Sequence, residues 1–506
     1  MTHSEGPSAP DEPGTAEAAP APAEAAPAPR RPPVRRYDHQ EILAIVIGMM
    51  PVLFMAAVDQ TVVSIALVAI SRDLGHVELV PWVATGYLIA STVATPIYGK
   101  LSDLFGRWPV LAVAICIFIG ASTLAALAQT MPQLLAFRLL QGLGGGGLIP
   151  LAQTVVGDVA PGHLRGRYQA WLASVFMAAA VLGPIAGGLL TEYLSWRAVF
   201  AAYLPLGIAA YIAARRALRT LAPIEVRRRP IDYTGALLLG VSVSCILIGL
   251  TALGGRAEGL AARVVPLFVI GTLAGIGLVA WERRAPEPIL PPSLFANRVI
   301  TLCCIVAGLG VFVMIGMSVL VPMALQSMHG LRADQVALAM VPLSFSAPCG
   351  SILCGKLMSR MVSFRYLLAA GQATCLVALL LLALLMPAPG IGFGLLLALL
   401  GAGVGMTMPA TIAASQMAVG PGLIGVATAT AALTRTLGGA VGVAVLGTVL
   451  FAVLGTAGGA TTDLAAVPLP TLETGFRVAY GLTAFVSALS LYTAMRLPLA
   501  NLQAGD

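Results

Sequence analysis

Long runs of apolar residues that contain no charge dominate this sequence and limit what it can fold into. Two of them are 110–127 and 392–408, and similar runs recur along most of the chain. A helix of about 20 residues crosses a hydrocarbon layer of about 30 Å, and only helices or closed barrels satisfy their backbone groups there. Because these runs are too long for barrel strands, the sequence predicts an all-α integral membrane protein.

Composition supports this class and argues against several others. Charged residues make up 10% of the 506 residues and hydrophobic residues 58%, whereas soluble domains carry about 25% charged residues. The net charge of +7 is scattered over the loops without a nucleic-acid-binding module, so we expect no nucleic acid partner. The seven cysteines lie in apolar runs without disulfide or metal-ligand spacing, so we expect no metal site.

The breaks between apolar runs predict about 14 transmembrane helices. The expected spans are 42–70, 81–102, 108–128, 133–157, 168–190, 196–217, 232–254, 262–281, 299–328, 334–358, 364–386, 390–418, 425–455 and 475–497. With the N-terminus inside, inner segments hold about 21 basic residues and outer segments about six, the asymmetry of the positive-inside rule. The sequence therefore predicts a multi-pass protein of a bacterial cell (inner) membrane with both termini in the cytoplasm.

Three patterns recur in order along the chain at nearly constant spacing. GKLSDLFGR at 99–107 is echoed at 355–365, and the glycines and proline of 142–150 are echoed at 401–409. LGPIAGG, which starts at Leu182, is echoed by LGGAVG from Leu437, and the three offsets are 256, 259 and 255 residues. Repeated halves with a site between them are typical of secondary transporters.

The repeat divides the chain into two six-helix pseudo-repeats plus two extra central helices. We expect the N-terminal half at 38–220, the two additional helices at 221–290 and the C-terminal half at 291–500. Residues 1–37 consist largely of Pro, Ala and Glu, a composition that cannot repay the entropy of ordering, so this cytoplasmic tail is expected to be disordered.

Several motifs carry a resemblance to a known family. GKLSDLFGRW at 99–108, FRLLQGLGGG at 137–146 and VLGPIAGG at 181–188 resemble the signature loop, the Arg–Gln–Gly motif and the antiporter motif of the major facilitator superfamily. AVDQTVVSIALVAI and SWRAVFAAYLPLG resemble its fourteen-helix drug:proton antiporter branch. The resemblance covers about 42–497 and implies a transporter rather than an enzyme, with the proton gradient as energy source and no cofactor.

Asp59 is the acid that we place inside a span, where a carboxylate costs about 2.5–3.5 kcal/mol to insert. A carboxylate whose surroundings change between conformations can bind a proton in one and release it in the other. Arg138 is the expected partner of Asp59, because helical rise places it at a similar depth, and the resemblance ties Arg138 to proton coupling. The alternatives are that Asp59 serves packing alone and that Arg138 reaches the outer headgroups.

The loop between the second and third spans is the expected cytoplasmic gate. By resemblance, Asp103 and Arg107 lock the two halves together there, while Gly99 and Gly106 permit the tight turn. Lys100 belongs to the same gate loop. The charges of Asp103 and Arg107 could instead only set the membrane topology.

Two further motifs contain small residues. The resemblance assigns Gln141 and Gly142 to the helix-four motif and a role in blocking leak to the antiporter motif, whereas close helix packing alone would also explain the small residues. The antiporter-motif residues are Gly183, Pro184, Gly187 and Gly188.

Arg435 lies about eleven residues into the thirteenth expected span, with no acid near it in the sequence. A buried Arg without a partner needs water, a carbonyl or an anionic ligand. Arg435 could therefore contact an acidic substrate, or it could lie nearer the inner surface.

Together these features predict a proton-coupled exporter of amphipathic drugs or antibiotics that works by alternating access as a monomer in the lipid bilayer. One alternative keeps the fold and exports a lipid, a siderophore or a self-made metabolite. A second is a membrane sensor that transports nothing. Acids lining the C-terminal cavity would favour cationic drugs, and we find none, so neutral or anionic cargo stays open.

Overall fold

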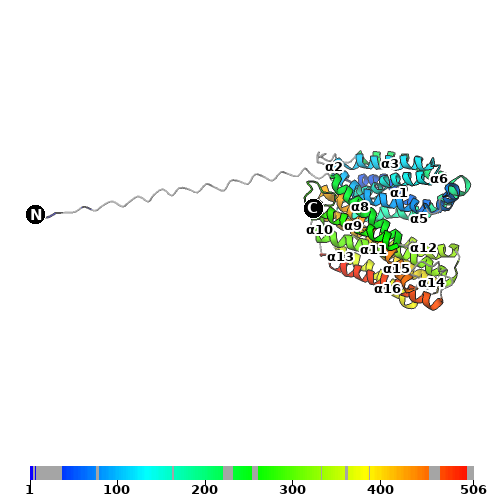
Figure 1. Ribbon diagram of the computed structural model, residues 1–506. Helices are drawn as coiled ribbons and strands as arrows, with labels where there is room; N and C mark the ends of the chain where they lie inside the picture. The colour runs from blue at the N-terminus through cyan, green and yellow to red at the C-terminus, as the bar shows by residue number, and fades with distance from the viewer. Residues whose placement is uncertain are drawn as a thin grey trace. The chain divides into compact units, whose positions relative to one another are not determined.

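The computed structural model describes residues 1–3, 6, 37–75, 79–161, 164–219, 232–253, 260–331, 333–358, 363–386, 388–454 and 468–498. All regular structure in these ranges is helical, and the helices belong to one unit that starts at Tyr37 (Figure 1). Apart from residues 1–3, 6 and 37, the expected disordered tail lies outside the described residues.

The helices of the N-terminal half lie together in Figure 1, drawn in blue to cyan. They are α1 (His39–Leu74), α2 (Val80–Phe105), α3 (Arg107–Ala126), α4 (Met131–Val159), α5 (Arg165–Tyr193), α6 (Trp196–Ala201) and α7 (Tyr203–Leu218). Their buried apolar side chains form one continuous core.

The remaining helices are the two additional ones and those of the C-terminal half. They are α8 (Tyr233–Leu253), α9 (Leu260–Glu282), α10 (Pro292–Ala296), α11 (Arg298–His329), α12 (Ala333–Met358), α13 (Phe364–Leu385), α14 (Ile391–Met417), the 3₁₀ turn η3 (Pro421–Leu423), α15 (Ile424–Val453) and α16 (Leu469–Met495). Two clusters of buried side chains hold the C-terminal half together.

Each of the 14 expected spans overlaps helix in the structure. Twelve helices in the described residues are long and apolar enough to cross a membrane, while α2 and α5 are long but are not among these twelve. The all-helical membrane architecture is therefore confirmed, and the number of 14 spans stays a prediction.

The sixth expected span, 196–217, matches one of these twelve, Trp196–Leu218, in which Ala202 separates α6 from α7. Ser195 begins α6 by accepting a hydrogen bond from Arg197 N, and the helix ends at Ala201. Pro205 follows in the first turn of α7, where its missing N–H leaves no donor for the carbonyl four residues earlier and its ring crowds that carbonyl. The proline, which the apolar run conceals, explains the break.

Glycines bring the middle helix of each half close to its neighbours. A Cβ on Gly146 of α4 would lie 2.3 Å from Ser91 O of α2, and a Cβ on Gly405 of α14 would lie 1.9 Å from Ala347 O of α12. Real Cβ atoms do not approach that closely, so only glycine fits. The repeated glycines therefore have the same packing role in both halves.

The additional helices pack where the two halves meet. Leu239 and Val243 of α8 contact Ile89 of α2 and Leu433 of α15 in one buried cluster. In contrast, only 17% of the apolar window of α9 is buried, against 61% for α1. α9 therefore presents most of its surface outward.

Candidate functional site

The structure brings Asp59 of α1 and Arg138 of α4 together in a buried ion pair. Arg138 Nη1 donates to both Asp59 carboxylate oxygens, at 3.0 and 3.1 Å, and also to Gln141 Oε1 at 2.6 Å. Gln141 Nε2 donates to Asp59 Oδ1 at 3.2 Å, which closes a triangle of three side chains. Arg138 points to Asp59 rather than out of the bundle, and both residues are at most 2% exposed.

Four neighbours surround this triangle. Arg138 Nε donates to Val83 O at 3.1 Å, and the Tyr87 ring centroid lies 4.4 Å from Arg138 Cζ. Gln141 Nε2 donates to Ser122 Oγ at 2.7 Å. The Tyr203 side chain is buried beside Asp59. The guanidinium thus keeps several partners besides the carboxylate.

Such a cluster is suited to proton binding and release. Removing one partner of a buried ion pair costs about 3–5 kcal/mol because the remaining charge is left uncompensated. Here Gln141 Oε1, Val83 O and the Tyr87 ring still contact Arg138 if Asp59 takes up a proton. Arg138 therefore has three contacts that do not involve the carboxylate.

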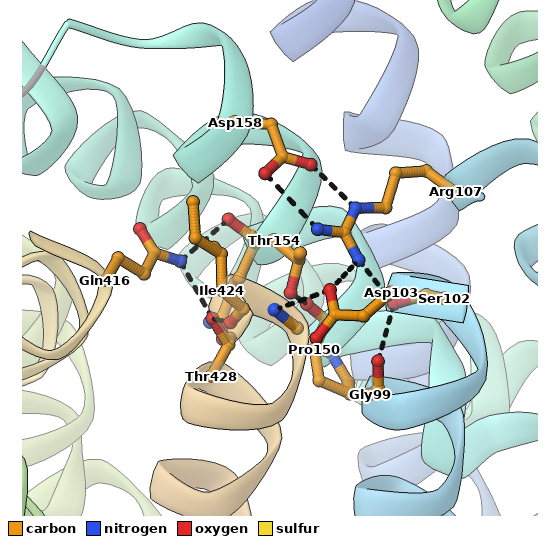
Figure 2. A network of polar contacts seen from close by, with 12 residues as sticks. Gly99, Ser102, Asp103, Arg107, Pro150, Thr154, Asp158, Gln416, Ile424 and Thr428 are labelled. Atoms are coloured by element: carbon orange, nitrogen blue, oxygen red, sulfur yellow. Dashed lines mark hydrogen bonds and ion pairs between the residues drawn. The ribbon is translucent and has the colours of Figure 1, made fainter. Parts of the chain in front are cut away.

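The loop between α2 and α3 forms the second polar network, which Figure 2 shows. Arg107 binds Asp158 at the end of α4 with Nε–Oδ2 and Nη2–Oδ1 distances of 2.6 and 3.3 Å. Its Nη1 donates to Ser102 Oγ at 2.7 Å and to Asp103 Oδ1. Gly106 adopts φ +91°, a conformation that favours glycine, where α2 turns into α3.

Asp103 links this network to the other half. Its carboxylate accepts hydrogen bonds from Gly425 N at 3.1 Å and Val426 N at 3.0 Å, both in the first turn of α15. A helix N-terminus carries unsatisfied N–H groups and partial positive charge, so it attracts an anion. Gly99 allows the approach, since a Cβ there would lie 2.8 Å from Gly425 O.

Gln416 makes a second link at the same end of the bundle. From the end of α14 its Nε2 donates to Gln153 O of α4 at 3.1 Å and to Thr428 Oγ1 at 3.0 Å. Gln169 Nε2 of α5 approaches Gln416 Oε1 at 3.4 Å. A Cβ on Gly157 would lie 2.5 Å from Gln416 Oε1, so this side chain of one half fits against a glycine of the other.

These contacts lie at one end of the bundle, which we name the gate end. It contains the ends of α2, α4, α12 and α14 and the beginnings of α3, α5, α13 and α15. The Asp103 and Gln416 hydrogen bonds between the halves are found there, as is the packing of Gly355 of α12 against Ala170 of α5. The structure is therefore closed at the gate end.

Lys100 connects the loop to the segment that follows α9. Its Nζ lies 2.7 Å from Glu287 Oε2, and both residues are buried. Glu282 Oε1 fixes the same segment by accepting from Ile289 N and Leu290 N at 3.1 and 3.2 Å. The additional helices are thus fastened to α2 beside the gate end.

The antiporter-motif glycines of α5 pack against α1. A Cβ on Gly183 would lie 2.1 Å from Thr61 Oγ1, and one on Gly187 would lie 3.1 Å from Val62 Cγ1. A Cβ on Gly188 would have nothing within 4 Å. The side chain of Pro184 lies outside the described residues. Close packing next to Asp59 accounts for two of the four positions.

Arg435 lies inside α15, eleven residues after that helix begins. It is 8% exposed, and its Nη1 has no hydrogen-bond partner among the described residues. It belongs to neither polar network. In the described side chains, no group of three or more His, Cys, Asp or Glu residues is arranged to hold a metal ion.

Sequence reasoning did not find Asp158, Gln416, Gln153 or Glu287. Gln416 and Gln153 contact each other across 263 residues of sequence, and Arg107 and Asp158 pair across 51. Neither residue pair belongs to a local pattern. The one feature of the sequence that could have indicated such residues is a charged or amide residue at the end of an otherwise apolar run.

Comparison with known families gives one family model along most of the chain. Residues 49–443 match the model described as "Major Facilitator Superfamily". Solved structures with the same fold include the human organic anion transporter MFSD10 (TETRAN), with a TM-score of 0.62 and 15% identity over 92% of this chain and 100% of that one. The proton:xylose symporter XylE gives a TM-score of 0.61 and 15% identity over 92% and 98%. At these identities the likeness concerns the fold alone.

Curated relatives are more similar in sequence. "Multidrug resistance protein 3" of Bacillus subtilis is 32% identical over 68% of this chain and 66% of its own length. "Multidrug transporter protein MdtP" of the same organism is 32% identical over 78% and 72%. An uncharacterised MFS-type transporter of Mycobacterium tuberculosis is 34% identical over 75% and 53%. The chain thus spans from about half to just under three quarters of the length of these relatives.

Proposed function

This chain belongs to the Major Facilitator Superfamily, and we propose that it is a proton-coupled exporter of amphipathic drugs or antibiotics that works by alternating access. The family and the related proteins are membrane transporters, so the chain is a transporter rather than an enzyme. The observation that carries the proposal is the buried Asp59–Arg138–Gln141 triangle.

In the proposed cycle a proton from outside neutralises Asp59. The Arg138–Asp59 attraction is then lost, and Arg138 keeps Gln141 Oε1 and Val83 O as acceptors. Because Asp59 and Gln141 lie on different helices, α1 and α4 become free to change their relative positions. Return of the proton to the inside restores the ion pair and resets the carrier.

The gate end is proposed to face the cytoplasm. The basic residues of the predicted inner segments favour this orientation, which places both termini inside the bacterial inner membrane. The present conformation would then be closed inward, and opening toward the cytoplasm requires that Asp103 leaves the first turn of α15 and that Gln416 leaves Gly157.

The proton gradient is the proposed energy source. Moving one unit charge across 100 mV supplies about 2.3 kcal/mol, which corresponds to about a fifty-fold concentration ratio. No cofactor is needed in this scheme, and the partners are protons, the lipid bilayer and one small amphipathic substrate. A monomer suffices because both halves belong to one chain.

Two of the relatives support drugs as cargo, since their names describe multidrug resistance and multidrug transport. A second candidate function is export of a metabolite that the cell makes itself. It is favoured by a relative named "Acurin A biosynthesis cluster MFS-type transporter" from Aspergillus aculeatus, which is 33% identical over 66% of this chain.

Dye efflux from energised cells tests the proposal. We would compare wild type, Asp59→Asn and Asp73→Asn at matched membrane expression, because Asp73 is an exposed acid on the same helix. Proton coupling through Asp59 predicts protonophore-sensitive efflux that Asp59→Asn abolishes and Asp73→Asn retains. Unchanged efflux in Asp59→Asn would remove this residue from the mechanism, and a wild type that moves no dye from a broad panel would favour a dedicated metabolite.

A further inference from the structure

Arg435 lies near the middle of α15 on the helix face that meets α14 and the N-terminal half. Eleven residues, or about 16 Å of helical rise, separate it from the start of α15 at the gate end. Thr428 is seven residues earlier, and residues seven apart share a helix face. Since Thr428 accepts from Gln416, which also reaches Gln153 of α4, the face that carries Arg435 is directed toward α14 and α4.

The described surroundings of Arg435 provide no counter-charge. The helices α8, α11 and α14 contain no acidic residue, and the acids of α2 and α4, Asp103 and Asp158, both pair with Arg107. In the second turn of α16, Glu473 lies close to the end of the bundle opposite the gate end. An ionised side chain buried without a partner is costly, and groups of this kind at membrane depth commonly serve ligands or ions.

The neighbours of Arg435 are small and apolar. Cys304 of α11 lies close enough to interact with it electrostatically, and Cys304 and Ala431 belong to one buried apolar cluster. A guanidinium presents parallel N–H donors that match a carboxylate, sulfonate or phosphate. One such cation among small apolar side chains is complementary to a molecule with an anionic group on an apolar body.

We propose that Arg435 binds the anionic group of the cargo, so that this transporter accepts amphipathic organic anions. The proposal rests on the proposed export function and adds the charge class of the substrate to it. Arg435 selects the anionic group, while Asp59, which pairs with Arg138, takes up and releases the proton in the other half. The two tasks are therefore located on different sets of helices.

Binding to the purified full chain in phosphatidylcholine nanodiscs is the first test. The probes are 1-naphthaleneacetate and 1-naphthaleneacetamide, which share a shape and differ in charge. The variants are Arg435→Gln, Arg435→Lys and, as a control that removes the same charge at an exposed site, Arg477→Gln. We expect wild type and Arg477→Gln to bind the carboxylate at least tenfold more tightly than the amide, and Arg435→Gln to bind both equally.

Arg435→Lys keeps the charge and is expected to keep part of the preference for the carboxylate over the amide. This variant tests the proposal if Arg435→Gln does not fold. A carboxylate preference that persists in Arg435→Gln, or none in wild type, would overturn the proposal. A lipid headgroup is the other source of such an anion. If added phosphatidylglycerol removes carboxylate binding in wild type and leaves amide binding unchanged, Arg435 is a lipid site and the cargo proposal is wrong.

Transport separates this inference from the export function. In energised cells, Arg435→Gln should lose at least tenfold in efflux of a carboxylate dye and retain protonophore-sensitive efflux of a neutral dye. Equal loss of both dyes at matched expression would contradict a role in charge selection. If wild type exports neither dye although the carboxylate preference in binding is present, the export function fails and the anion site stands.

Discussion

The two halves of this transporter share a packing pattern and differ in the charges placed on it. Four residues before the first repeated glycine, the N-terminal half has Arg138 and the C-terminal half has Leu397. One residue before that glycine the pair is Gln141 and Leu400. All four side chains are buried, so the same helical position accommodates either a charged cluster or leucine.

The difference separates what folding needs from what transport needs. Because leucines pack well at these positions in the C-terminal half, the ion pair of the N-terminal half is not required to bring such helices together. A buried ion pair is also weak evidence for stability, since its desolvation offsets much of its attraction. The charged cluster is therefore explained best by the proposed proton step.

The largest expected effect comes from making the N-terminal half resemble the C-terminal half at one position. Arg138→Leu leaves Asp59 buried without its cation, which should destabilise the protein by about 3–5 kcal/mol. Adding Asp59→Asn removes the uncompensated charge and should restore most of this loss without restoring proton-driven efflux. Thermal unfolding of the purified variants measures the loss and recovery of stability, and dye efflux measures transport. Equal instability of the single and double variants would mean that the shape of the leucine, and not the unpaired charge of Asp59, causes the loss of stability.

The repeated glycines sharpen the comparison because they should behave alike in both halves. Gly146→Ala and Gly405→Ala each place a methyl group against a backbone oxygen of the adjacent helix, at an expected cost of about 1–3 kcal/mol. Gly120→Ala is the control, since nothing lies within 4 Å of its added methyl group. The same unfolding measurement applies, and a large effect confined to one half would contradict equivalent packing.

A smaller effect is expected where the halves touch. Gln416→Ala removes hydrogen bonds at the gate end, each with a net contribution of about 0.5–1.5 kcal/mol. Cys354, buried in α12 four residues before the end of that helix, should then react faster with a maleimide, measured by mass spectrometry. Cys375 is buried in the core of the C-terminal half and should react at an unchanged rate. Faster reaction of both would indicate general unfolding instead.

The smallest effect concerns a surface ion pair of the N-terminal half. Hydrogen bonds from Arg197 and Trp196 lower the pKa of Asp73 below its ordinary value of 3.8. A carboxyl group with a lowered pKa in the folded state stabilises the protein above the unfolded pKa, and this contribution disappears as the pH falls through the folded pKa. Asp73→Asn should thus cost little at neutral pH, because the pair is partly exposed, and nothing once the pH has fallen below the folded pKa of Asp73. A loss of stability that persists in acid would assign Asp73 another role.

The sequence predicted the membrane class, the helix positions and the pairing of Asp59 with Arg138, since these follow from apolar runs and from the cost of charge at membrane depth. It missed the one-residue break at Ala202, because Pro205 lies inside a run that remains apolar overall. It also missed Gln416 and Glu287, whose partners lie far away in the sequence and are brought close only by packing of the halves. Contacts of this kind have no local signal.

The Lys100–Glu287 ion pair fastens a mostly outward-facing helix to the gate end. α9 has 23 residues, about 34 Å of helix, against 32 residues in α11. A helix that faces lipid pays fractions of a kcal/mol for each Å by which its hydrophobic length differs from the bilayer thickness. Any tilt by which α9 relieves this mismatch would pull on α2 next to Asp103. We therefore expect the opening of this carrier to depend on the acyl-chain length of the surrounding lipid.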